Sequence, residues 1–472
     1  MTRPLRAAPL LLALTACTAL GGCTVGPNYH LPQNAAIQRP SAQGAWREGG
    51  EEVTAQPLPA RWWHLFNDPE LDRLEEQALA ANTDLAAAGA NLERAAAVTR
   101  ATEGERTLNL DATFAAERSR LSGESFLLKD PLPVANLGAA ALSLSYQVDL
   151  FGRIRRAVEA ARAGQAASEA TRDAVRVTLA ADVARSYLAL CSAHRAEDVA
   201  TQSAELANRS LSISQRLLAA GKAPRTEVTL AEARAKAAEA AVPMHRARAR
   251  AALYRLAYLL GRTPAEAPQE ADTCRTIPRV TTPLPTGDGA ALLARRPDVR
   301  AAERELAAAT AEIGVATAEM YPQITFGASG GSNGFLADLG QGAANTWGFG
   351  PLVHWNIPGA GARARLAATK AGAKVALDRF DSVVLGALRE TETALSTYAE
   401  GEKRLDALRE TRKAADEAAE QARRLREAGK AQLAVDISGR QSANAALAAE
   451  VAEEAESAQD QVSVFLALGG GW

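Results

Sequence analysis

Apolar and polar residues alternate along four short segments, which is the pattern of a β-strand with two unlike faces. In the segment LSLSYQV at 142–148, Leu142, Leu144 and Tyr146 are separated by small or polar residues. The alternation predicts strands over 108–116, 139–150, 323–329 and 346–357. The run GASGG at 327–331 predicts a turn where the third of these strands ends.

Each second strand leads into a long stretch rich in Ala, Arg and Glu without a helix breaker, which predicts two long helices over about 153–219 and 363–428. Roughly 65 helical residues make a rod of roughly 100 Å. Gly221 and Gly429 then allow the chain to reverse. Return helices are expected over 225–260 and 433–467, and shorter first helices over about 69–105, with Asp68 as N-cap, and 290–318.

The two halves of the chain share one plan. The stretch RLLAAGKA at 216–223 recurs as RLREAGKA at 424–431, so Gly221 and Gly429 lie 208 positions apart. The sequence therefore predicts two tandem repeats, 68–261 and 290–468, each with a helix, two strands and a long hairpin (153–260 and 363–467). We expect the non-helical joints to gather where the shorter helices meet. These joints are 24–67, 262–289 and the tail 469–472.

The N-terminal residues have the layout of a secretory signal. Arg3 and Arg6 precede a short apolar core that ends in LGGC, too short for a membrane-spanning helix. We expect residues 1–22 to be removed and Cys23 to receive a lipid, which makes 23–67 a lipidated N-terminal segment. The run LTAC, which ends at Cys17, fits the same pattern, so Cys17 stays an alternative.

Composition narrows the class of protein. The 472 residues are 47% hydrophobic but only 5% aromatic, a balance that suits alanine-rich tubes and coiled coils better than thick globular cores. A net charge of −2 gives no footprint for nucleic acid. The five histidines are scattered and no nucleophile lies in a recognisable local signature, so we expect no catalytic residue, metal or cofactor.

Four amphipathic strands raise a problem of closure. About eight strands are the minimum for a barrel, and an open strand edge is not tolerated in lipid. If the apolar faces of these strands meet lipid, the chain must oligomerise. Three copies would bring twelve strands together above a tube of helices.

Specific motifs resemble one family along the whole mature chain. They are YQVDLFGR at 146–153 and LLARRPDVRAAERELAAATAEIGVATAEMYPQI at 292–324, supported by WWHLFNDPELDRLEEQALAANTDL at 62–85 and by GPNY after Cys23. The chain resembles the TolC-like outer-membrane efflux proteins, in particular the lipoprotein branch (NodT or OprM type) that serves resistance-nodulation-division (RND) pumps. Type I secretion channels share the tube but usually lack the lipobox and RRPDV.

The resemblance implies a mainly α fold with a transmembrane β-barrel contribution. A homotrimer would form a twelve-stranded barrel in the outer membrane on a long periplasmic α-helical barrel, with Cys23 carrying diacylglycerol and palmitate. It would dock with a periplasmic adaptor and an inner-membrane RND transporter and conduct small molecules passively. A periplasmic adaptor, which has a single hairpin, and a cytosolic coiled-coil scaffold, which has no signal segment, fit the sequence less well.

The resemblance also implies that the tube narrows at its periplasmic tip, where the turns at Gly221 and Gly429 converge. In the stretch AGKAQLAVDISGRQS, Asp436 is kept, but Ser438 and Gly439 replace a more usual acidic residue and alanine. We expect Asp436, with Arg225 or Glu227 of the first turn, to form the gate. The alternative is that these are solvated charges at the tip.

Cys191 and Cys274 are expected to form a disulfide. Cys191 lies about 30 residues before the Gly221 turn, roughly 45 Å along the helix, and the return helix climbs to roughly 55 Å before the joint that holds Cys274. Both thiols therefore reach the same level in an oxidising compartment.

Overall fold

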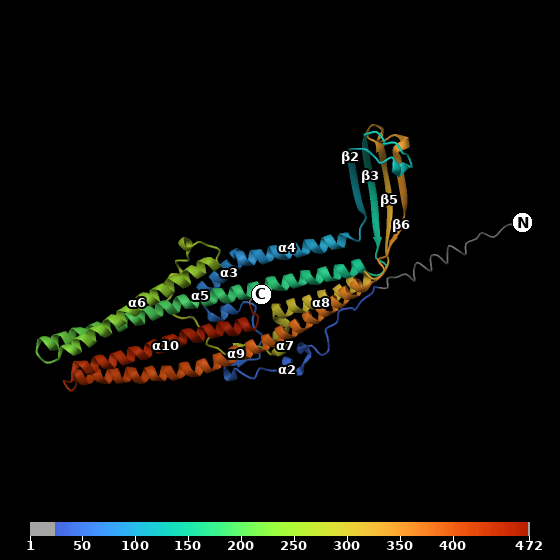
Figure 1. The fold of residues 1–472 in the computed structure, drawn as a ribbon. Coiled ribbons are helices and arrows are strands. Elements are labelled where there is room, and N and C mark those ends of the chain that lie inside the picture. The colour runs from blue at the N-terminus through green and yellow to red at the C-terminus, as the bar shows by residue number, and fades with distance from the viewer. Residues whose placement is uncertain (1–23, 471–472) are drawn as a thin grey trace. The chain divides into compact units, whose positions relative to one another are not determined.

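The protein is described from residue 24 to residue 470 by a computed structural model (Figure 1). The expected signal peptide 1–22 and the alternative lipid acceptors Cys17 and Cys23 lie outside the described residues. The chain divides into two compact units. Of the described residues, the strand unit comprises 24–32, Asn91–Ser168 and Ala301–Phe380, and the hairpin unit comprises Gln33–Ala90, Glu169–Arg300 and 381–470.

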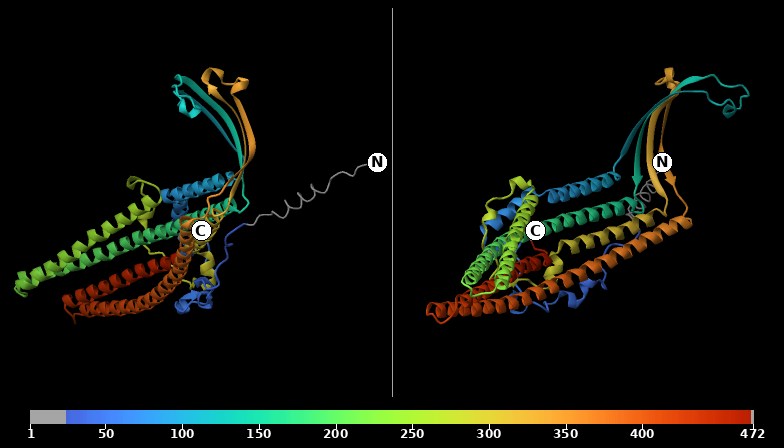
Figure 2. Two further views of the ribbon diagram at one scale, coloured as in Figure 1. Left: turned by 45° about the vertical axis from the view of Figure 1, so that its right-hand side comes forward. Right: turned by 60° about the vertical axis from the view of Figure 1, so that its left-hand side comes forward.

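A four-stranded antiparallel sheet dominates the strand unit, in the order β2-β3-β5-β6. The strands are β2 (Asn109–Ser119), β3 (Ala135–Val148), β5 (Gln323–Phe335) and β6 (Asn345–His354). Figure 2 shows that the sheet bends along its length. Short 3₁₀ turns lie in the connections: η4 (Glu124–Phe126), η7 (Leu336–Asp338) and η8 (Gly342–Ala344).

The turn predicted for GASGG at 327–331 is wrong, because β5 continues through these residues to Phe335. One of the glycines, Gly331, serves close strand pairing instead. A Cβ atom on Gly331 would lie 2.4 Å from the carbonyl oxygen of Ala140 in β3, a distance that no side chain permits. Glycine is the sequence signal both for a turn and for a close approach of two backbones, so the sequence alone does not separate the two.

The strand β3 passes into helix α5 (Arg153–Ala219) through a side-chain cap. The Asp149 carboxylate accepts hydrogen bonds from the backbone N–H groups of Ile154, at 2.9 Å, and Arg155, at 2.8 Å. These donors belong to the first turn of the helix and have no partner within it. The cap explains how a polar-faced strand can lead almost directly into a helix of 67 residues.

Two helical hairpins form most of the hairpin unit. In Figures 1 and 2, α5 lies beside α6 (Arg225–Leu259), and α9 (Ala360–Glu427) lies beside α10 (Leu433–Ala467). Gly221, with φ +68°, and Gly429, with φ +69°, end the outgoing helices in the left-handed region. The N–H of Lys222 donates to the Leu217 carbonyl, and that of Lys430 to the Leu425 carbonyl, which is the glycine-ended helix stop.

The sequence predicted one helix over 69–105 and one over 290–318, but in the structure each of these segments forms two helices. Asn82 separates α3 (Pro69–Ala81) from α4 (Thr83–Gly104), because its side chain accepts a bond from the Leu85 N–H and donates to the Leu259 carbonyl. Arg296 separates α7 (Gly289–Arg295) from α8 (Pro297–Ala318), since a residue before proline avoids the helical region. The predicted N-cap at Asp68 is confirmed: its carboxylate accepts bonds from Glu70 and Leu71.

The joints of the hairpin unit gather around the end of α10. β1 (Val53–Thr54) pairs in parallel with β4 (Leu284–Pro285), and the rings of Trp62 and Phe465 lie 4.8 Å apart. The joints also contain short turns of helix: η1 (Ala36–Gln38), α2 (Pro40–Gln43), η2 (Gly50–Glu52), η3 (Trp62–Phe66), η5 (Pro264–Glu266) and η6 (Ala271–Thr273). Between residues 24 and 470, no helix is both long and apolar enough to cross a membrane.

Candidate functional site

One face of the sheet is apolar across all four strands. The register places Leu110 opposite Leu144, Leu144 opposite Ala328, and Ala328 opposite Phe349. The next row on this face is Ala112, Leu142, Gly330 and Trp347, and a third contains Tyr146, Phe326 and Pro351. Phe349 and Trp347 are each 81% exposed and Phe114 is 70% exposed. Such a continuous exposed apolar surface marks a contact with something other than water.

The opposite face carries polar and small residues in the same register. One row across the sheet reads Asp111, Ser143, Ser329 and Gly348, and the next reads Asn109, Ser145, Gly327 and Gly350. The alternation that predicted the strands is therefore aligned from strand to strand. This arrangement suits a wall with an apolar medium on one side and water on the other.

The sheet is open at both sides. β2 and β6 each pair with only one neighbour within residues 24–470, so each has a row of unpaired backbone groups. In an apolar medium each such group would cost several kcal/mol, because no water replaces the missing partner. A single chain therefore leaves the backbone groups of its two edge strands unpaired in the apolar medium that its apolar face requires.

The residues that follow Cys23 are fastened to the strand unit. The buried Arg156 of α5 donates to the carbonyl oxygens of Val25 and Gly26, each at 3.2 Å, and to the Asn28 side chain at 2.7 Å. Gly26 has φ +87°, and a Cβ atom there would lie 2.5 Å from the Cα of Gly314. We call Thr24–Tyr29 the N-terminal strap. The strap contains the GPNY motif, whose glycine lets the backbone lie close against α8.

At the tip of the α9–α10 hairpin, Asp436 is only 2% exposed and pairs with two arginines. Its Oδ2 lies 3.0 Å from the Nε of Arg426, and its Oδ1 lies 3.0 Å from the Nε of Arg440. Sequence reasoning missed both arginines. The spacing of Asp436 and Arg440, four residues apart on one helix, could have indicated the second, but Arg426 is brought in only by the turn.

The other predicted gate residues lie apart from Asp436. Arg225 and Glu227 are exposed at the start of α6, and neither is bonded to Asp436 in the part of the chain described. The unusual Gly439 has a packing role. A Cβ atom at that position would lie 3.1 Å from the Cα of Ala419, so glycine lets α10 approach α9 closely beside Asp436.

Cys191 and Cys274 are joined in the structure. Their Sγ atoms lie 2.04 Å apart and their Cα atoms 5.0 Å apart. Next to the bond, the Nε2 of His194 lies 3.0 Å from a carboxylate oxygen of Asp272. Together these contacts fix η6 and the cysteine that follows it to α5.

Arg296, in the RRPDV stretch, connects three elements. Its guanidinium donates to Asp298 at 2.9 and 2.6 Å, to Glu390 of α9 at 3.0 Å, and to the carbonyl of Ala467 at the end of α10 at 2.8 Å. The planar, multi-donor guanidinium suits such a three-way contact, which the single ammonium of lysine could not reproduce. The motif therefore anchors the C-terminal end of α10.

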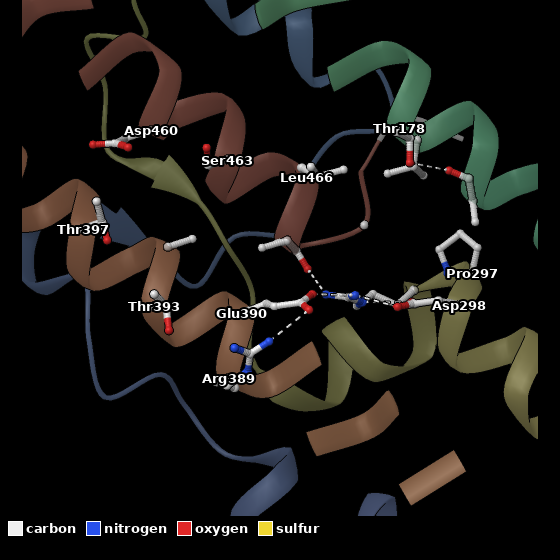
Figure 3. Close-up of a pocket in the computed structure, with 16 residues that line it drawn as sticks. Thr178, Pro297, Asp298, Arg389, Glu390, Thr393, Thr397, Asp460, Ser463 and Leu466 are labelled. Atoms are coloured by element: carbon white, nitrogen blue, oxygen red, sulfur yellow. Dashed lines mark hydrogen bonds and ion pairs between the residues drawn. The ribbon is translucent and has the colours of Figure 1, made fainter. Parts of the chain in front are cut away.

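A cavity of about 600 Å³ lies beside this anchor (Figure 3). We call it the α9–α10 cavity; α5 and α8 also contribute to its wall. Asp460 and Thr397 lie toward one end of it and Asp298 toward the other (Figure 3). Burial, with the carboxylates of Glu456, Glu453 and Glu402, raises the pKa of Asp460 to about 6. Sequence reasoning did not find this cavity, because it depends on the packing of four helices.

Comparisons with known proteins agree on one family. Residues 74–262 and 290–470 match the family described as "Outer membrane efflux protein". Nodulation protein T of Rhizobium leguminosarum bv. trifolii is 31% identical over 378 residues, which are 80% of this chain and 79% of that protein. Pyoverdine export outer membrane protein OpmQ of Pseudomonas aeruginosa is 30% identical over 478 residues, 98% of this chain and 97% of that protein.

A solved structure gives the same result. The outer-membrane channel OprN is 33% identical and superposes with a TM-score of 0.85, over 95% of this chain and 100% of that chain.

Proposed function

The chain belongs to the outer membrane efflux protein family, and on that premise we propose that three copies form the exit duct of a tripartite RND-type pump. The protein is a channel of the outer membrane and not an enzyme. A periplasmic adaptor would join the duct to an inner-membrane transporter that supplies the energy. Small molecules would then cross passively from the periplasm to the exterior.

The apolar face of the open sheet carries this proposal. Three copies, each joining its β2 edge to the β6 edge of the next, would close a twelve-stranded barrel and leave no unpaired edge in lipid. The row of Leu144, Ala328 and Phe349 would then face lipid, and the row of Ser143, Ser329 and Gly348 would face the water-filled interior. The long hairpins of two tandem repeats would form the periplasmic tube below.

Conductance across a planar bilayer, with the oligomer mass measured on the same detergent-extracted sample, tests the duct. We expect a trimer with small, mostly closed currents. A monomer or dimer without conductance would overturn the proposal.

A matched pair of variants tests the orientation of the sheet, because Phe114 lies on the apolar face of β2 and its neighbour Thr113 on the polar face. Phe114→Lys should be lost from the outer membrane, at a cost of about 2–4 kcal/mol, whereas Thr113→Lys should assemble and conduct.

We propose that Asp436 closes the tip by fixing the turn at Gly429. Its two ion pairs, to Arg426 and Arg440, support a positioning role, because they lie within one hairpin. The exposed Arg225 and Glu227 near the turn at Gly221 would contribute the charge that faces neighbouring copies.

The gate proposal is tested by recording single trimers. Asp436→Ala should raise the open fraction, because it leaves two arginines without their carboxylate and loosens the turn. Glu417→Gln, which neutralises an exposed carboxylate on α9 outside the tip, should leave the current unchanged. Current through Asp436→Ala trimers equal to that of the wild type would refute the role.

We further propose that the protein carries a lipid anchor. Residues 1–22 are removed and Cys23 is acylated. The N-terminal strap supports Cys23, because it holds Thr24 beside Gly152, at the junction of the sheet and α5. Mass spectrometry of the mature N-terminus separates the alternatives. Cys23→Ser should remove the lipid mass, whereas Cys17→Ser should leave the mature mass unchanged; the reverse result would assign the lipid to Cys17.

A further inference from the structure

The α9–α10 cavity contains one carboxylate that is without a partner. At the anchor end, Arg296 bridges Asp298 and Glu390, and Arg389 lies 3.4 Å from Glu390, so the charges there are matched. Asp460, at the other end, has no hydrogen bond or ion pair to another described residue and is only partly exposed. Three carboxylates act on its charge: Glu456 and Glu453 on α10 and Glu402 on α9. Glu453 and Glu402 have arginine partners of their own, Arg404 and Arg279, whereas Asp460 has none among the described residues. A negative charge thus stands uncompensated inside a cavity.

The remaining lining is apolar or carries hydroxyl groups, and the Thr178 hydroxyl among these donates to the Ala174 carbonyl within α5. Val177, Leu466 and Ala394 supply apolar surface. Thr393 and Thr397, one turn apart on α9, line the cavity, and neither hydroxyl is hydrogen-bonded within the part of the chain described. The Ser463 hydroxyl is different, because it donates to the Gln459 carbonyl and accepts a bond from Arg185 of α5.

We propose that this cavity binds organic monocations with an apolar body, such as a protonated amine or a quaternary ammonium ion, with Asp460 as the counter-ion. The volume of about 600 Å³ lies within the range of sites for drug-sized molecules. The cationic centre would pair with Asp460, hydrogen-bonding groups would reach Thr393 and Thr397, and the body would cover Val177 and Leu466. An inorganic ion is a poorer occupant, because residues 24–470 contain no cluster of three or more metal-binding side chains.

The site goes beyond the proposed duct, since it assigns a chemical preference to one place in the wall of the hairpin unit. Ethidium is a suitable probe, because it is a fluorescent organic monocation. Fluorescence anisotropy is measured on the full-length protein in nanodiscs of zwitterionic lipid. We expect saturable binding that weakens about tenfold or more in Asp460→Asn and is unchanged in the matched control Glu417→Gln. Binding should also fall as the pH is lowered through about 6 and Asp460 takes up a proton.

Further measurements make the test decisive. Because Asp460 has no bonded partner among residues 24–470 and burial disfavours its charge, Asp460→Asn should keep the oligomer mass of the wild type and should melt no lower than the wild type. Should Asp460→Asn fail to fold, Ala394→Trp fills the cavity and should abolish binding. Equal affinity of wild type and Asp460→Asn for ethidium, or equal binding of the anion 8-anilinonaphthalene sulfonate at this place, would overturn the proposal. Conductance recorded on the same samples keeps this outcome distinct from a failure of the duct.

Discussion

Glu75 on α3 offers a sharp test of how burial controls stability in this fold. Its side chain is fully buried, and neither carboxylate oxygen has a hydrogen-bond partner among residues 24–470. Burial, with the nearby Asp72 carboxylate, raises the pKa of Glu75 well above its ordinary value of 4.5, and the backbone of Ala184 opposes this only in part. The folded protein therefore holds Glu75 in its neutral form under conditions where the unfolded chain ionises it.

The sign of the pH dependence follows from this difference. Because the folded state holds the proton of Glu75 more tightly, the contribution of Glu75 to the unfolding free energy is highest at low pH. It falls by about 1.4 kcal/mol per pH unit as the pH rises above 4.5 toward the folded pKa. Even the neutral carboxyl group leaves polar atoms unsatisfied, at a cost of about 1–3 kcal/mol. Glu75→Leu should therefore stabilise the protein, and the gain should widen with pH.

Thermal melting between about pH 5 and pH 8, followed by circular dichroism, compares three variants with the wild type. Glu75→Leu should melt higher throughout, and Glu75→Gln should lose the pH-dependent part only. Glu76→Gln is the matched control, because Glu76 is exposed on the same helix and lies 3.7 Å from Arg61. A melting curve of Glu75→Leu below that of the wild type, or one that runs parallel to it across the pH range, would refute the reasoning.

Three further predictions rest on single contacts. Arg296→Lys should destabilise the protein by about 3 kcal/mol, because it leaves buried acceptors unmatched; protease resistance of the C-terminal end checks this. Gly331→Val should prevent the pairing of β5 with β3, because its Cβ meets the Ala140 carbonyl, and the trimer should be absent from the outer membrane fraction. Alkylation without reductant should leave the mass of Cys191 and Cys274 unshifted, and reduction should lower the stability by about 2–4 kcal/mol.

The sequence was most informative where the pattern is long or repeated. The helical stretches and the glycine stops at Gly221 and Gly429 could be located because helix formers and their terminators act locally. The family resemblance based on YQVDLFGR and RRPDV is confirmed by the match to the outer membrane efflux proteins. Motifs of this kind retain information that periodicity alone does not contain.

The sequence was least informative where one residue type has two physical uses. The glycines of GASGG predicted a turn, but the run continues β5 and Gly331 allows close strand pairing there, and only the neighbouring strand decides between these uses. Asn82 breaks a helix by bonding to Leu259, far along the chain. Asp436 stood out as a charge at a turn, but its burial between Arg426 and Arg440 depends on how two helices meet.

The glycine- and serine-rich face of the sheet limits what the membrane part of the proposed duct can do. Ser143, Ser329 and Gly348 are too short to reach into the lumen or to grip a passing solute. Apart from Asp111 of β2, which lies in the same row, that section would offer a passing solute few side chains to bind, and most chemical selection would be left to the helical hairpins. Exchanging strands between relatives of this channel should therefore leave the spectrum of exported compounds unchanged, whereas exchanging hairpins should alter it.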